Sequence, residues 1–261
     1  MFSNLSAHFS QSQMDAMVDV GFRFGDKGTH TSRTIMLSEL SELLDGCDSA
    51  ASREAYAEAI IADNLLNKKT SATRRLTNQR LGELYALDAA SPLFRIMRQF
   101  WQTDVVGRPL LAMLMALCRD PLLRATAPEI FRVPVGEELR RNALSEAIRS
   151  AVGPRLNDNI LDKVVRNAGS SWTQSGHLSG RVRKIRQRVK ATALSAAYAL
   201  YIGYLTGERG SALLSTSWAK VLDSNPDELL FLAMDARRLG VLELREAGSV
   251  VDITFPNLLK A

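Results

Sequence analysis

Residues 167–205 read NAGSSWTQSGHLSGRVRKIRQRVKATALSAAYALYIGYL, and this stretch decides the fold because it joins a polar Gly/Ser segment, a basic segment and an apolar segment. The apolar side chains between Val182 and Leu200 recur every three or four residues, so at 100° per residue they share one stripe. We therefore expect a polar loop over residues 169–180, followed by one helix through residue 205 whose second half is buried.

The first turns of this expected helix are basic. No acidic residue occurs between Asp162 and Glu208. Cations near a helix N-terminus are unfavourable because the helix dipole is already positive there, and a bound anion relieves this. We expect phosphate binding here, with an ordinary solvated helix face as the alternative. The expected contacts are Arg181, Arg183, Lys184, Arg186, Arg188 and Lys190.

The preceding loop carries side chains that can reach phosphates and base edges. Residues 170–177 read SSWTQSGH, and the neighbouring glycines let the backbone approach a ligand. Trp172 either stacks on a base or fills the core beneath a polar turn, and both interpretations remain open. The expected nucleic-acid-binding residues of this loop are Ser170, Ser171, Trp172, Thr173, Gln174 and His177.

Positive charge is concentrated in two windows of the chain. Residues 163–207 contain eight Lys/Arg and no acid, and residues 64–82 contain five Lys/Arg and no acid. Because the formal net charge is +5, removing these thirteen charges leaves −8 for the rest. Such segregation indicates a polyanionic partner, which can be DNA, RNA or an acidic protein.

The basic window at residues 64–82 has the pattern of a helix-turn-helix. Ser52 is suited to cap one helix, residues 67–69 form a polar turn, and Thr70 or Ser71 caps a second helix that ends near Leu87. Arg, Asn and Gln on the outer face of such a helix can bind base edges in the major groove. An ordinary helical hairpin is the alternative. The expected contacts are Lys68, Lys69, Ser71, Arg74, Arg75, Asn78 and Gln79.

The whole sequence predicts a mainly all-α protein, a multi-helix bundle with a helix-turn-helix-like N-terminal part. Near the C-terminus, two helical patterns precede two alternating segments joined at Ala247–Gly248, the order of a winged-helix-like unit with one β-hairpin. The second helix of that unit is acidic, so a structural or protein-binding role is expected for it. The expected parts are an N-terminal arm at 1–32, the helix-turn-helix-like part at 33–90, a central bundle with the basic helix at 91–208, and the winged-helix-like unit at 209–261.

Catalytic and metal-binding signatures are not evident. The three histidines lack zinc-site spacing, and the sequence holds neither a G-x-S-x-G elbow nor a Gly-rich phosphate loop. We expect no catalytic residue, no metal and no cofactor. The isolated Cys47 and Cys118 fit a reducing cytoplasm, and the longest apolar runs are too short to span a bilayer, so no membrane association is expected.

Several short motifs resemble the BrxA family of the BREX bacterial phage-defence systems. They are Asp63-Asn64-Leu65-Leu66, Lys68-Lys69-Thr70, Thr73-Arg74-Arg75, Arg80-Leu81 before Leu84-Tyr85, the later basic segment, and a Gly-Val-Leu segment near the end. The resemblance covers about Arg33 to Phe255. It implies a mainly helical, non-enzymatic protein, likened to the NusB antitermination fold, which binds nucleic acid beside the system's ATPase, methyltransferase and phosphatase-like proteins.

The function expected from the sequence is therefore binding of double-stranded DNA by a cytoplasmic accessory protein of a BREX-like antiviral defence system. Two alternatives remain. One is a NusB-like RNA-binding factor, and the other is a scaffold whose basic faces dock an acidic protein.

Overall fold

A computed structural model describes the chain except for residues 1–4, 6–8, 26, 249 and 260–261, so part of the expected N-terminal arm lies outside the described residues. The protein is mainly helical with a β-hairpin near the C-terminus, as predicted. The α-helices are α1 Gln11–Asp19, α2 Leu37–Gly46, α3 Arg53–Ile61, α4 Ser71–Tyr85, α5 Pro92–Thr103, α6 Arg108–Arg119, α7 Pro121–Arg132, α8 Arg141–Val152, α9 Asp158–Gln174, α10 Ala193–Leu205, α11 Ser217–Lys220, α12 Pro226–Arg238 and α13 Pro256–Leu259.

The remaining elements are short. The 3₁₀ helices are η2 Thr29–Thr31, η3 Gly153–Arg155 and η4 Gly210–Ser215. The strands are β1 Leu178–Ser179, β2 Ile185–Arg186, β3 Glu243–Ala247 and β4 Val250–Thr254. They form two antiparallel pairs, β1 with β2 and β3 with β4.

Local capping residues explain where the main helices begin. Thr70 precedes α4 and its hydroxyl accepts a hydrogen bond from the Thr73 amide. Asn157 caps α9 in the same way, and capping boxes formed by Thr192 and Asn225 begin α10 and α12. These side chains satisfy amides that have no partner within the helix.

Helix α6 lies at the centre of the core. All residues from Leu110 to Cys118 are buried, and α6 contacts α4, α5, α7, α9 and α10. The buried cluster continues from the N-terminal segment to Phe255 in the C-terminal unit, across all the expected boundaries, and the division into four parts stays a prediction. No helix within the described residues is long and apolar enough to cross a membrane.

The expected helix-turn-helix region consists of α3, a turn over residues 62–70, and α4. The turn is longer than the predicted one, and both Asn64 and Asn67 adopt left-handed backbone conformations in it. Asparagine tolerates this conformation better than most residues, which explains how the chain reverses here without glycine.

The prediction of one long helix after residue 180 is wrong. Residues 178–186 form a β-ribbon, and α10 begins only at Ala193. The ribbon also pairs with residues 136–139, since the Leu139 amide donates to the Lys184 carbonyl and the Arg186 amide donates to the Glu137 carbonyl. These tertiary hydrogen bonds hold the segment extended. The helical spacing of the apolar residues in this segment does not indicate these hydrogen bonds.

The predicted loop over residues 169–180 is wrong in its first half, because α9 continues to Gln174. The hydroxyls of Ser171 and Thr173 donate to the carbonyls four residues earlier, at Asn167 and Gly169, so these polar side chains are accommodated inside the helix. Trp172 on the same helix is fully buried. The residues that look loop-like in sequence therefore form the inner end of a packed helix.

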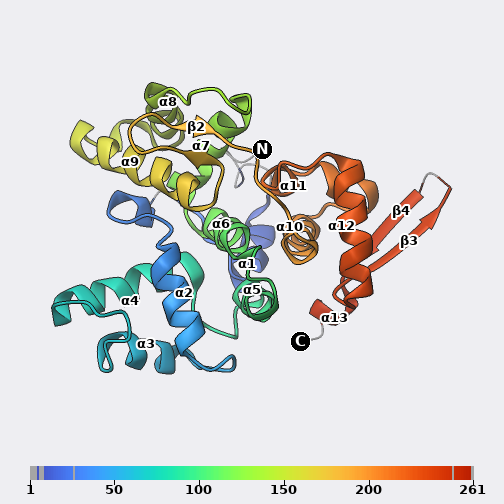
Figure 1. Cartoon of the computed structure of the whole chain (residues 1–261), viewed down its shortest axis with the longest axis horizontal. Helices are drawn as coiled ribbons and strands as arrows, with labels where there is room; N and C mark the ends of the chain where they lie inside the picture. The colour runs from blue at the N-terminus through green and yellow to red at the C-terminus, as the bar shows by residue number, and fades with distance from the viewer. Residues whose placement is uncertain (1–4, 6–8, 26, 249, 260–261) are drawn as a thin grey trace.

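The C-terminal unit has the predicted order of helices followed by a hairpin. The expected first helix is a 3₁₀ segment, η4, joined to the short α11, whereas α12 and the β3–β4 hairpin lie close to their expected positions. In Figure 1 this unit lies on the right, with α12 between α10 and the hairpin.

We predict that Trp172→Ala lowers the free energy of unfolding by about 3–5 kcal/mol. The Trp172 side chain is 0% exposed, its indole N–H donates to the Thr126 hydroxyl, and its ring meets those of Phe131 and His177 edge to face. The substitution removes this packing and leaves a cavity. Chemical denaturation of the two proteins measures the difference.

The matched control is Val182→Ala on the ribbon, because Val182 is 90% exposed. This change should alter the free energy of unfolding by no more than about 0.5 kcal/mol. A Trp172→Ala protein as stable as the Val182→Ala protein would contradict the buried position of Trp172.

Candidate nucleic-acid interface

The N-terminal half of α4 presents free cations to solvent. Lys69 lies just before the helix and Arg75 lies in its second turn; both are exposed. Neither forms a hydrogen bond or ion pair with any residue that the structure describes. Ser71 is exposed beside them, and the first turn holds no acidic side chain. This surface combines free cations with the positive end of a helix dipole, a combination that attracts phosphate.

The other expected contacts of this region, on α4 and in the turn before it, are already engaged. Lys68 forms an ion pair with Glu39. Arg74 donates to the carbonyl of Ile61 at the end of α3. Asn78 accepts a hydrogen bond from Arg53, and Gln79 donates to Glu83. Of the expected base-reading residues Arg75, Asn78 and Gln79, only Arg75 extends from the helix without a partner in the described chain.

The ribbon and the segment that follows it contribute a second set of exposed cations. Arg181 and Lys190 are exposed and make no ion pair within the described residues. Lys184 is half-buried, and its ammonium donates to the Thr173 hydroxyl on α9 and to the Gly180 carbonyl. Burial lowers the pKa of Lys184. Lys184 therefore links the ribbon to α9. Two hydrogen bonds of its ammonium are already made within the protein.

Acidic residues from distant parts of the sequence pair with two of the exposed cations between residues 181 and 190. Arg183 pairs with Glu138, and Arg188 pairs with Glu228. Both pairs are exposed, and such pairs exchange readily with other anions because they contribute little stability. The charge separation seen along the sequence is therefore smaller in space.

The side chain of Arg186, expected as a nucleic-acid contact, is only 4% exposed and lies inside the protein. Its guanidinium pairs with the Asp223 carboxylate and donates to the carbonyls of Ile130 and His177. It also lies over the ring of Phe131. Arg186 joins the ribbon to α7 and to the segment before α12, so its charge is used in packing.

The expected contacts in residues 170–177 are also internal. Ser171, Trp172 and His177 are buried, while Ser170 and Thr173 are half-buried on α9. The remaining one, Gln174, is half-buried; its amide oxygen accepts from the Leu37 amide and its nitrogen donates to Thr34. The side chains of Ser171, Trp172, Thr173, Gln174 and His177 have hydrogen-bonding partners within the protein, which argues against their contact with a ligand.

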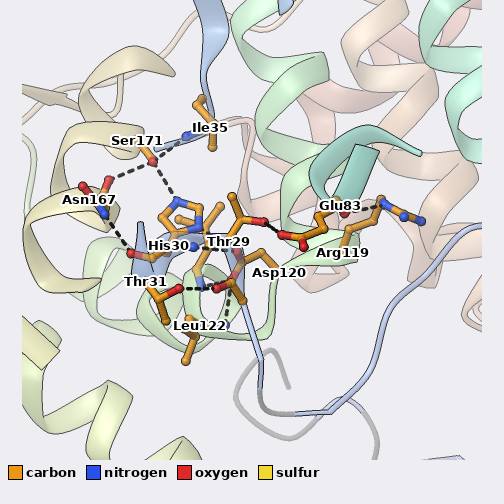
Figure 2. Close-up of polar contacts among 12 residues, drawn as sticks. Thr29, His30, Thr31, Ile35, Glu83, Arg119, Asp120, Leu122, Asn167 and Ser171 are labelled. Atoms are coloured by element: carbon orange, nitrogen blue, oxygen red, sulfur yellow. Dashed lines mark hydrogen bonds and ion pairs between the residues drawn. The ribbon is translucent and has the colours of Figure 1, made fainter. Parts of the chain in front are cut away.

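A buried hydrogen-bond network joins the N-terminal segment to α7 and α9 (Figure 2). The His30 Nδ1–H donates to the Asp120 carboxylate at 2.8 Å, and His30 Nε2 lies 2.8 Å from the Ser171 hydroxyl oxygen. Asp120 also accepts from the amides of Leu122 and Leu123 and so caps α7. Burial alone raises the pKa of Asp120, but the charge and hydrogen bonds of His30 outweigh it and hold that pKa below its usual value.

The order Ser171, His30, Asp120 is that of a catalytic triad, yet the serine cannot act as a nucleophile here. The Ser171 hydroxyl is fully buried, accepts from the Ile35 amide and donates to the Asn167 carbonyl. A catalytic serine needs an open face and an adjacent oxyanion site. No local sequence pattern indicates this network, because His30 lies 90 residues from Asp120 and 141 residues from Ser171.

The same network fixes the position of α4. The Tyr85 hydroxyl donates to the Ile35 carbonyl, and the Thr29 hydroxyl donates to Glu83, so the C-terminal end of α4 is attached to the segment that His30 anchors. Gly28 lies so close to Asp120 that a Cβ there would be 2.3 Å from its carboxylate oxygen. The segment is therefore seated against the start of α7.

No group of residues within the described chain is arranged to hold a metal ion. No protein-family model matches the chain, and no curated protein is significantly similar to it.

We predict that the buried His177 makes the folded protein less stable as the pH falls. Burial lowers its pKa to about 4, against an ordinary value of 6.5, and its Nε2–H donates to the Val221 carbonyl. Between these values the unfolded chain binds a proton that the folded chain does not. The contribution of His177 to the free energy of unfolding is complete above pH 6.5. It is lost as the pH falls towards 4, at about 1.4 kcal/mol per pH unit and roughly 3 kcal/mol in total.

Urea unfolding of the wild type and of His177→Gln at several pH values between 4.5 and 6.5 tests this. Glutamine can retain a donor to Val221 but does not titrate. The free energy of unfolding of His177→Gln should therefore change less steeply with pH, by the contribution of about one proton, whatever its absolute stability. Equal slopes in the two proteins would contradict a buried, neutral His177.

Proposed function

We propose that the protein binds double-stranded DNA without catalysing a reaction, and that the N-terminal half of α4 enters the major groove. The observation that carries the proposal is the pair of exposed, unpaired cations Lys69 and Arg75 at the start of the second helix of a helix-turn-helix-like unit. In such units this end of the helix meets base edges. Arg75 is suited to bind guanine O6 and N7, and Lys69 is suited to bind phosphate.

The ribbon and the segment that follows it support the proposal as a second contact. Arg181 and Lys190 are exposed, and Arg183 can exchange Glu138 for a phosphate. In Figure 1, α4 and the ribbon at β2 both lie on the half of the molecule opposite the β3–β4 hairpin. We propose that the two basic regions contact one extended polyanion.

The C-terminal unit is a poorer DNA-binding surface. Helix α12 begins with Asp227 and Glu228, and the hairpin carries Glu243, Glu246 and Asp252 on exposed positions. These charges repel phosphate. We propose a protein-binding role for this unit, consistent with an accessory protein that works beside other proteins.

The wider role rests on the sequence resemblance alone. On that basis we propose an accessory protein of a BREX-like phage-defence system, located in the cytoplasm, where the free thiols of Cys47 and Cys118 remain reduced. RNA binding by a NusB-like factor and docking of an acidic protein are the competing functions. Competition between duplex DNA, structured RNA and heparin for the protein distinguishes them.

The test of the α4 contact starts from a duplex site selected from random sequences. We expect Arg75→Ala to weaken binding to that site by about 1–3 kcal/mol and to relax the sequence preference, because it removes a base contact. Lys69→Ala should weaken binding to all sequences alike. It should also reduce the slope of log affinity against log salt concentration by the contribution of about one phosphate contact. Fluorescence anisotropy at several salt concentrations measures both effects.

Arg238→Ala is the matched control, because Arg238 is an exposed arginine on α12 paired with Asp235. It should leave affinity and salt slope unchanged. If selection returns no enriched site and Arg75→Ala binds like Arg238→Ala, then α4 does not read DNA.

A further inference from the structure

The turn between β1 and β2 carries an exposed apolar side chain between two arginines. Val182 is 90% exposed, the largest exposed fraction among the large apolar side chains of the described chain. Arg181 and Arg183 flank it, and both are exposed. An isolated exposed valine is ordinary on a protein surface. Val182, however, lies at the end of an exposed, cationic turn.

The turn is held in place by contacts on both sides. Gly180 adopts a φ of +89°, and a Cβ there would be 2.2 Å from the Arg183 carbonyl oxygen, so glycine is required for the chain to reverse. The Lys184 ammonium bonds the Gly180 carbonyl across the turn and the Thr173 hydroxyl on α9. Leu139 and Glu137 pair with the strand that follows. The Arg-Val-Arg tip is therefore presented on a fixed base.

We propose that this tip, residues 180–184, enters the minor groove of double-stranded DNA while α4 occupies the major groove. Arginine is attracted by the negative potential of a narrow minor groove, and apolar side chains contact its floor. Val182 takes the floor position, and Arg181 and Arg183 lie along the walls. The inference rests on the proposed DNA binding. It adds that the protein also contacts the minor groove and prefers base pairs without an amino group in that groove.

Modified bases separate the two grooves. Inosine in place of guanine removes the 2-amino group from the minor groove and leaves the major-groove edge unchanged, whereas 7-deazaguanine removes N7 from the major groove only. Anisotropy titrations compare one duplex sequence in its guanine, inosine and 7-deazaguanine forms. We expect the wild type to bind the inosine duplex about fivefold or more tightly than the guanine duplex.

Val182→Ser and Arg181→Gln should bring the ratio of inosine to guanine affinity close to one, while the effect of 7-deazaguanine, which reports on Arg75, persists. Both side chains are exposed, so the variants should keep the wild-type melting temperature. Val250→Ala is the matched control, because Val250 is an exposed valine of the other hairpin, 65% accessible. It should keep the wild-type ratio.

A wild-type ratio of one, with DNA binding and the 7-deazaguanine effect intact, overturns the minor-groove position and leaves the proposed function standing. An inosine preference that survives in Val182→Ser and Arg181→Gln also overturns it, since another part of the chain then reads the groove. Failure of the wild type to bind any duplex overturns both. Binding of an acidic polypeptide in place of DNA, lost in Arg181→Gln, would identify the tip as a protein contact.

Discussion

The buried carboxylate of Asp120 is the group on which the arrangement of the helices most depends. It caps α7 and receives both the backbone amide and the ring N–H of His30, which in turn contacts Ser171 on α9. A buried carboxylate that loses its partners is left without compensation for its charge, which is strongly destabilising. The network therefore enforces one position for the segment after Gly28, and α2 and α4 are attached to that segment.

Helix α9 links the two proposed DNA contacts. Through Ser171 it holds Ile35, whose carbonyl accepts the Tyr85 hydroxyl of α4, and through Thr173 it holds Lys184 at the base of the ribbon tip. Two side chains on one helix thus set the relative position of α4 and the tip. Contact residues on rigid elements cost less ordering on binding, which favours affinity. Residues that the sequence indicated as ligand contacts instead support the contact surfaces.

The helical class, the α3–α4 pair and the C-terminal hairpin could be predicted from the sequence because local capping and periodicity determine them. The ribbon could not, since Ile185 and its neighbours keep a helical spacing while their hydrogen bonds go to residues 136–139, distant in sequence. The polar residues around Trp172 are typical of a loop, and the sequence cannot show that the hydroxyls of Ser171 and Thr173 bond to carbonyls within their own helix. Likewise, the basic window looked unpaired because Asp223 and Glu228 meet it only in the folded chain.

The central claim is that DNA meets α4 and the ribbon tip, while the end of α9 and the C-terminal unit stay outside the contact. Hydrogen–deuterium exchange with and without a bound duplex tests it most directly, because it reports on all segments at once without a substitution. Bound DNA should slow exchange in peptides covering residues 69–75 and 180–184 and leave those covering α12 and the β3–β4 hairpin unchanged. Protection confined to α12 and that hairpin, with none at residues 69–75, would contradict the account.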